Sequence, residues 1–163
     1  MKTKKLVTCA MLAAIACVAT MIIRIPIPKG YVNFGDCIVL LGGFLLGPVS
    51  GALAAGIGSA LADIFSGYAI YALPTFVIKG LMAFIGAVLL KRFSDNKFWY
   101  IFLYTFICEL IMILGYFLFE SVLYGFVAAF ASVIGNSMQG LFALFAAPLI
   151  YRCSKKLKIT IDK

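Results

Sequence analysis

The sequence predicts an all-α, polytopic membrane protein built as a bundle of six transmembrane helices. Three observations support this prediction. First, 64% of the 163 residues are hydrophobic and only 12% are charged, whereas a soluble domain is about half apolar and about 25% charged. Second, uncharged runs recur that are long enough to cross a hydrocarbon core about 30 Å thick. Third, the basic residues collect between alternate runs. We expect residues 1–163 to form one transmembrane domain.

The first uncharged run, Leu6–Ile23, predicts a transmembrane helix over residues 6–23. Lys2, Lys4 and Lys5 precede it, as they would in a signal peptide. However, the basic, proline-containing segment Arg24–Lys29 follows it in place of a small-residue cleavage site. The run is therefore interpreted as a retained first helix.

The second uncharged run, Cys37–Ala62, contains the pair Gly47-Pro48. Proline suits the first turn of a helix and breaks a helix interior. The pair therefore predicts a tight turn that separates a short helix at 35–46 from a longer one at 48–65.

The remaining chain predicts three more helices. Pro74 suits the first turn of a helix at 74–90, and the next apolar run gives a helix at 98–118. Ser121–Tyr151 is uncharged throughout, which is more than one span needs and too little for two spans and a turn. A single, bent helix at 124–151 is the simplest solution.

Charge sets the expected orientation. Six crossings place both termini on one side, and that side then holds most of the 14 lysines and arginines. The positive-inside rule predicts that the N and C termini are cytoplasmic. The net charge of +8 therefore indicates membrane topology, and no nucleic-acid partner is expected.

The predicted topology gathers polar side chains toward the outer ends of the helices. Charged groups embedded in a membrane cost several kcal/mol unless they are paired or hydrated, so such residues are functional candidates. We expect an outward-open pocket with tyrosines to stack on a flat ligand and charged groups to recognise its substituents. The candidate substrate-binding residues are Asn33, Asp36, Asp63, Tyr68, Tyr71, Lys79, Asn136 and Gln139.

Structural explanations are open for the same residues. Asp36 suits the first turn of a helix, where the dipole favours an anion. Asp63 and Lys79 could form a structural ion pair, and we expect Asp63 as the partner of Lys79. Asn136 and Gln139 could join helices by hydrogen bonds. The two tyrosines could be ordinary membrane-interface aromatics.

The composition argues against an enzyme or a metal protein. There is no histidine, and the five cysteines lie far apart with no C-x-x-C pair. We expect no metal, no cofactor and no catalytic residue. A small intramembrane enzyme that uses Asp36, Asp63 and Glu120 is the rival interpretation, although Glu120 is expected in a solvated loop. Glu109, inside a predicted span, could be a buried structural carboxylic acid.

Small residues mark two of the predicted helices. Ala10 and Ala14 form an A-x-x-x-A pair, and Gly47 and Gly51 have G-x-x-x-G spacing, which lets helices approach closely in lipid. The alanine face could pack within the bundle, dock on a partner, or make a homodimer of a structural membrane protein.

Five segments together resemble a known family: Tyr31–Asp36 (YVNFGD), Leu46–Gly51 (LGPVSG), Gly56–Asp63 (GIGSALAD), Ser66–Tyr68 (SGY) and Ile78–Gly80 (IKG). The pattern is similar to the substrate-binding membrane subunit, or S component, of energy-coupling factor (ECF) vitamin importers. It most resembles the branch of riboflavin, hydroxymethylpyrimidine and vitamin B6 carriers.

The resemblance implies a six-helix subunit, in a bacterial plasma membrane, that binds a water-soluble vitamin or precursor at its outer face. It implies docking through Ala10 and Ala14 on a transmembrane coupling subunit, with two ATP-binding subunits driving reorientation of the bundle. This chain has no G-x-x-x-x-G-K-[ST] phosphate loop of its own. The third helix, Gly51–Asp63, differs from that of riboflavin carriers, which favours a pyridine or pyrimidine ligand and leaves riboflavin as the alternative.

Overall fold

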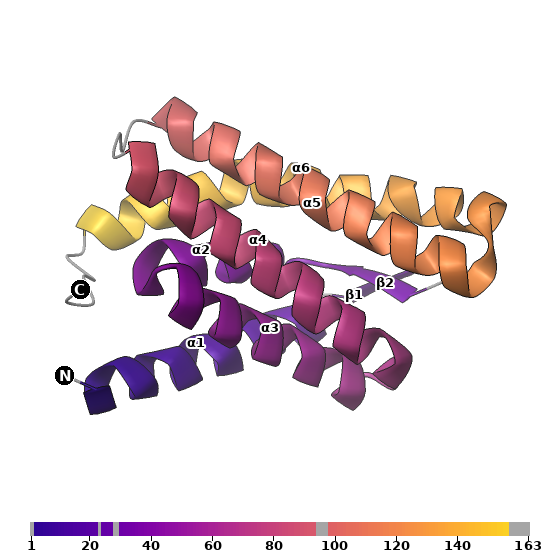
Figure 1. The fold of residues 1–163 in the computed structure, drawn as a ribbon, viewed down its shortest axis with the longest axis horizontal. Helices are drawn as coiled ribbons and strands as arrows, with labels where there is room; N and C mark the ends of the chain where they lie inside the picture. Colours follow the sequence, from indigo (N-terminus) through magenta and orange to yellow (C-terminus); the bar gives the residue numbers. More distant parts are fainter. Residues whose placement is uncertain (1, 23, 28–29, 94–97, 157–163) are drawn as a thin grey trace.

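The computed structural model describes residues 2–22, 24–27, 30–93 and 98–156 (Figure 1). Within them lie six α-helices, one antiparallel hairpin and a short 3₁₀ helix. In chain order these are α1 (Lys2–Ile22), β1 (Arg24–Ile27), β2 (Gly30–Asn33), α2 (Asp36–Leu46), α3 (Pro48–Phe65), η1 (Ala69–Tyr71), α4 (Ala72–Phe93), α5 (Phe98–Tyr124) and α6 (Phe126–Lys156). The prediction of an all-α membrane bundle with six helices is confirmed.

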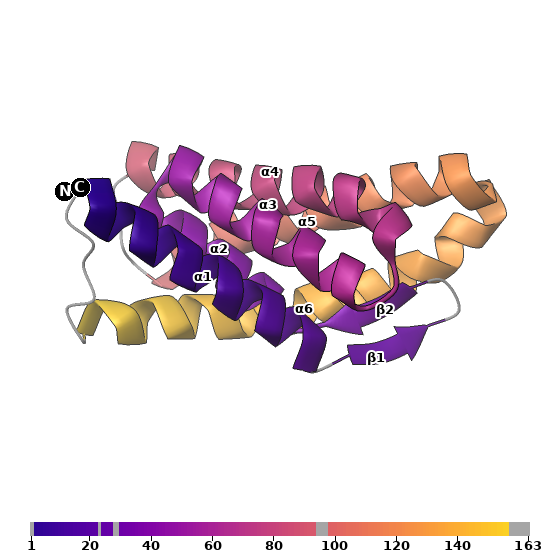
Figure 2. The ribbon, with the colours of Figure 1, turned by 90° about the horizontal axis from the view of Figure 1, so that it is seen from below.

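The helices run side by side along the long axis of the molecule, and α1 begins and α6 ends at the same end of the bundle (Figures 1 and 2). We call this the terminal end, and the opposite end, which holds η1 and the α5–α6 turn, the distal end. Five of the described helices are long and apolar enough to cross a membrane. The exception is α2, whose 11 residues extend only about 16 Å.

The sequence did not predict the hairpin, which explains why the second helix is short. Residues 24–33 were expected to form a connection, yet β1 and β2 pair with Arg24 opposite Asn33 and Ile27 opposite Gly30. Proline in β1 is compatible with an edge strand because only one side of the strand is paired. The hairpin lies in the distal half and α2 in the terminal half, so together they make the second passage along the bundle (Figure 2).

Helix ends follow glycine and proline in most places. α2 ends at Leu46 and α3 begins at Pro48, on either side of Gly47. The larger difference from expectation is in α5, which continues to Tyr124, beyond the expected end at 118. α6 then begins at Phe126 and continues as one helix past Pro148 to Lys156.

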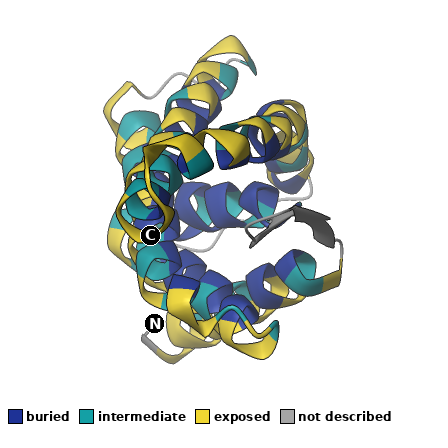
Figure 3. Cartoon of the chain, turned by 90° about the vertical axis from the view of Figure 1, so that its right-hand side faces the viewer, coloured by how far each residue is buried: buried dark blue, intermediate teal, exposed yellow. Residues whose placement is uncertain are grey.

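Small residues bring the helix backbones together. A Cβ atom added at Gly58 of α3 would lie 2.3 Å from the carbonyl oxygen of Ala13 in α1, so only glycine permits this approach. Buried residues line the inner faces of the helices and exposed ones their outer faces (Figure 3). The exposed outer faces are rich in large apolar side chains such as Leu53, Phe106 and Leu141, as expected where lipid is the solvent.

The prediction that the N and C termini are cytoplasmic rests on where the basic residues lie. Four of these residues are outside the described part of the chain: Lys29, Lys97, Lys158 and Lys163.

Candidate ligand-binding site

A buried polar cluster joins three helices near the middle of the bundle, and we call it the central cluster: Asp36, Lys79 and Gln139. Asp36 is the first residue of α2, where the helix dipole favours a carboxylate. Its Oδ1 atom forms an ion pair with the Nζ atom of Lys79 on α4. Its Oδ2 atom accepts a hydrogen bond of 2.5 Å from the Nε2 atom of Gln139 on α6. Because all three residues are at most 2% exposed, the cluster is shielded from solvent.

The hairpin is attached to the central cluster. The backbone N–H of Asn33, the last residue of β2, donates a 2.8 Å hydrogen bond to Oε1 of Gln139. The side-chain oxygen of Asn33 accepts a 2.8 Å hydrogen bond from the backbone N–H of Gly35, just before α2. Gln139 therefore connects the end of the hairpin to Asp36.

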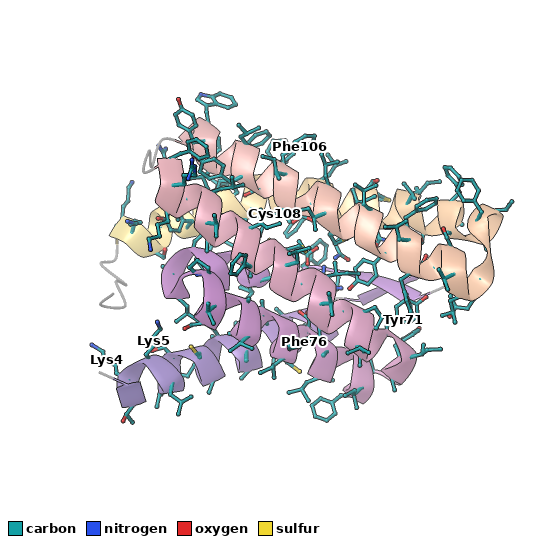
Figure 4. The ribbon with its side chains drawn as sticks, in the orientation of Figure 1. Lys4, Lys5, Tyr71, Phe76, Phe106 and Cys108 are labelled. Carbon is teal, nitrogen blue, oxygen red and sulfur yellow. The ribbon has the colours of Figure 1, made fainter. Side chains whose placement is uncertain are left out.

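A second group of polar side chains lies between the cluster and the distal end. The hydroxyl groups of Thr75 and Tyr116 are 3.0 Å apart, and the Tyr116 ring lies 5.5 Å from Lys79 Nζ. Further out, the Tyr71 hydroxyl donates a 3.2 Å hydrogen bond to Glu120 Oε1. Figure 4 places Tyr71 near the distal end, far from Lys4 and Lys5.

The expected partner of Lys79 was wrong: its carboxylate is that of Asp36, and not that of Asp63. Lys79 lies seven residues into α4, about 10 Å along its axis. Asp63 lies only two residues before the end of α3, which joins α4 at the distal end. The two side chains therefore start at different depths, whereas the short α2 begins at the depth of Lys79. Asp63 is itself buried, and its backbone oxygen accepts a hydrogen bond from Tyr68 N–H.

Glu120 also differs from expectation. It was expected in a solvated loop, but α5 extends past it and its side chain is only 3% exposed. The sequence held a signal that would have found it, because Glu109, Tyr116 and Glu120 are spaced i, i+7 and i+11 and therefore share one face of a helix. Among the polar residues that the predicted site omitted, Thr75, Glu109 and Glu120 are buried and Tyr116 is part-buried.

The other predicted residues occupy the same half of the bundle. Tyr68 precedes η1, and its ring centroid lies 6.4 Å from that of Tyr71. Asn136 is buried on α6, three residues before Gln139. Within the described residues, no group of three or more histidine, cysteine, aspartate or glutamate side chains is arranged to hold a metal ion.

The alanine pair of α1 lies apart from the cluster. Ala10 and Ala14 are exposed, whereas Ala13 packs against Gly58 of α3. Near the terminal end, α1 and α3 border an apolar groove of about 530 Å³ whose lining includes Ala10 and Lys5.

Comparisons with known proteins agree with this architecture. The sequence model of the ECF-type riboflavin transporter S component family matches residues 1–157. The solved structure of the S component of a bacterial ECF transporter has the same fold. Its TM-score is 0.79 over 97% of this chain and 99% of that chain, at 24% sequence identity. An uncharacterized protein in a gap 3′ region of Pyrococcus woesei is 42% identical over 124 residues, which are 75% of this chain and 82% of that protein. The chain therefore belongs to the family of ECF-type riboflavin transporter S components, the membrane-embedded substrate-binding subunits of vitamin transporters.

Proposed function

We propose that this S component binds a small, flat vitamin or vitamin precursor of the pyridine or pyrimidine type at the central cluster. Membership of the family makes it a multi-pass membrane transport subunit and not an enzyme. The finer assignment rests on one observation: a buried carboxylate, ammonium and carboxamide meet at one point, with an aromatic ring 5.5 Å from the ammonium group. In a site of low dielectric, such groups recognise ring substituents strongly.

The proposed ligand-binding residues form two groups. The central cluster and Asn33 would read polar substituents, because they offer both hydrogen-bond donors and acceptors. Tyr68 and Tyr71, on the distal side, would stack on the ring. Asp63 and Asn136 are buried in the same half of the bundle as these tyrosines and would line the path of the ligand to the central cluster.

Riboflavin is the second candidate ligand. The family description, which names riboflavin transporters, favours it. A pyridine or pyrimidine requires fewer polar contacts than the three-ring flavin with its ribityl chain, and a cluster of three polar side chains favours the ligand with fewer polar groups.

We further propose that transport requires a transmembrane coupling subunit and two ATP-binding subunits. The exposed alanine face of α1 and the adjoining groove lined by Ala10 would receive a helix of the coupling subunit, since small residues permit close approach in lipid. ATP hydrolysis by the partners would then reorient the bundle and deliver the vitamin. In this arrangement the terminal end is cytoplasmic and the distal end faces outward.

Mass spectrometry of small molecules extracted from the purified protein tests the proposed ligand. We expect a pyridine or pyrimidine vitamin, or its precursor, to be enriched over a preparation of the Lys79→Met variant. Enrichment of riboflavin would favour the second candidate. Enrichment of a compound unrelated to vitamins would contradict both.

A further inference from the structure

Glu109 is a buried carboxyl group that the proposed site does not yet use. It lies on α5, and Figure 4 places its neighbour Cys108 near the middle of the bundle. The Glu109 side chain is 3% exposed. Neither of its carboxyl oxygens has a hydrogen-bond partner in the described part of the chain. A buried polar group of this kind is rare in native structures and calls for an explanation.

The surroundings of Glu109 place it beside the central cluster. It packs against α6 at Gly140, where an added Cβ atom would lie 3.3 Å from both Cβ and Oε2 of Glu109. The preceding residue, Gln139, is hydrogen-bonded to Asp36. Asp36 and Lys79 are also the charged groups that act electrostatically on Glu109. The buried site thus holds two carboxyl groups and one ammonium group, and the ammonium group is already paired with Asp36.

The other side of Glu109 offers little to satisfy it. There, α5 and α6 border a hollow of about 280 Å³, lined mainly by apolar side chains such as Leu110 and Leu144, with Ser137 as the one hydroxyl group. An apolar hollow stabilises neither an unpaired carboxyl oxygen nor a negative charge on Glu109. A hydrogen-bond donor on a bound molecule would satisfy the Glu109 carboxyl group.

A carboxyl group matches one kind of ring edge especially well. An amino group next to a ring nitrogen presents two hydrogen-bonding positions side by side. An ionised carboxylate accepts from the amino group and from a protonated ring nitrogen. A protonated carboxyl accepts from the amino group and donates to the unprotonated ring nitrogen.

We propose that Glu109 contacts the bound ligand directly and selects rings that carry an amino group beside a ring nitrogen, the aminopyrimidine class. This inference rests on the proposed function and narrows its ligand. Glu109 would be a binding residue with no role in holding the empty protein together, since the fold provides it with no hydrogen bond.

Calorimetry with a matched pair of ligands tests this role. The pair is 4-amino-5-hydroxymethyl-2-methylpyrimidine and the same compound without its amino group. We expect Glu109→Met to lower affinity for the amino compound by roughly 10- to 100-fold, as for loss of a hydrogen bond to a charged group. Affinity for the compound without the amino group should fall by a clearly smaller factor, since only the bond to its ring nitrogen can be lost. Thermal stability should be unchanged or higher.

Two further variants separate recognition from packing. Gly140→Ala keeps the Glu109 carboxyl group but shifts its position, so it should also reduce the preference for the amino compound. Glu120→Met removes a second buried carboxyl group of α5 that does have a partner, Tyr71. It should lower thermal stability and change the affinity for both pyrimidines by the same factor.

The outcomes distinguish this inference from the proposed function. The inference would be overturned if Glu109→Met lost affinity for both pyrimidines by the same factor. It would also be overturned if Glu109→Met failed to fold and Gly140→Ala kept the native preference for the amino compound. Binding of pyridoxine or riboflavin by the native protein, with neither pyrimidine bound, would overturn the inference alone. If the folded native protein bound none of these compounds, the proposed function itself would fail.

Discussion

Lys79 lies near the middle of α4, where an unpaired ammonium group would cost several kcal/mol. Asp36 at the start of α2 provides the counter-charge, and Gln139 satisfies the second carboxylate oxygen. Good geometry with every atom partnered is the condition under which a buried ion pair is tolerated. The arrangement explains how α2, too short to cross a membrane, is fixed at its buried end.

Lys79→Met should therefore affect both folding and binding. Removing the ammonium group leaves Asp36 buried without its counter-charge, which destabilises a protein by about 3–5 kcal/mol. Thermal unfolding should show this loss, and ligand titration should show weaker binding.

Two controls accompany this variant. The double variant Lys79→Met with Asp36→Asn should recover part of the stability, because no charge is then left unpaired. Lys91→Met, on the exposed last turn of α4, should be neutral. If Lys79→Met were neutral in both measurements, Lys79 would have no role in the cluster.

The sequence identified Asp36, Lys79 and Gln139 individually but not as one cluster. Polar residues within apolar runs are conspicuous, because the membrane makes them costly. Their pairing depends on the depth at which each helix starts, and the depth of α2 is set by a hairpin that the sequence did not reveal. Glu120 was misplaced because a charged residue at the end of an apolar run predicts the end of a membrane span, whereas α5 continues to Tyr124.

At the scale of single elements, α1 has two distinct faces. Ala13 lies against Gly58 of α3, with no room for a larger group between them. Ala14, the next residue, is exposed on the outer side of the bundle. Ala10 and Ala14, the A-x-x-x-A pair, are therefore not buried by packing within the described bundle. This face of α1 is available to a partner.

Ala14→Trp should separate ligand binding from transport. The indole would project outward, so the variant should fold and bind the vitamin normally. It should no longer co-purify with the coupling subunit or support uptake, because the bulky ring prevents close approach of a partner helix. Ala16→Trp is the matched control: Ala16 is 1% exposed, and a Cβ atom added at Gly58 of α3 would lie 3.0 Å from its Cβ atom, so stability and affinity should fall together. Loss of both properties in Ala14→Trp would contradict docking through this face.

Element boundaries followed from the sequence where glycine or proline marks them, as at the Gly47 turn between α2 and α3. The hairpin did not, because its strands are four residues long and Pro26 makes the first of them resemble a loop. Short strand pairs give no periodic signal. Their pairing is a tertiary feature, and here β2 lies against α6.

At the scale of the whole molecule, the two ends of the bundle differ in chemistry. The terminal end carries the apolar groove between α1 and α3, and Figure 4 places Lys4 and Lys5 there. The central cluster, Tyr71 and Glu120 occupy the middle and distal half. This separation is what a transport subunit requires, because ligand recognition and partner docking can then use different surfaces.

Calorimetric titration of the purified protein with B vitamins and their precursors tests the central claim most directly. The claim is that the central cluster forms a vitamin site. We predict submicromolar binding of at least one small ring compound by the native protein, and a large loss of that binding in Lys79→Met. The claim would be contradicted if the folded native protein bound no member of the panel, or if Lys79→Met bound the same compound with unchanged affinity.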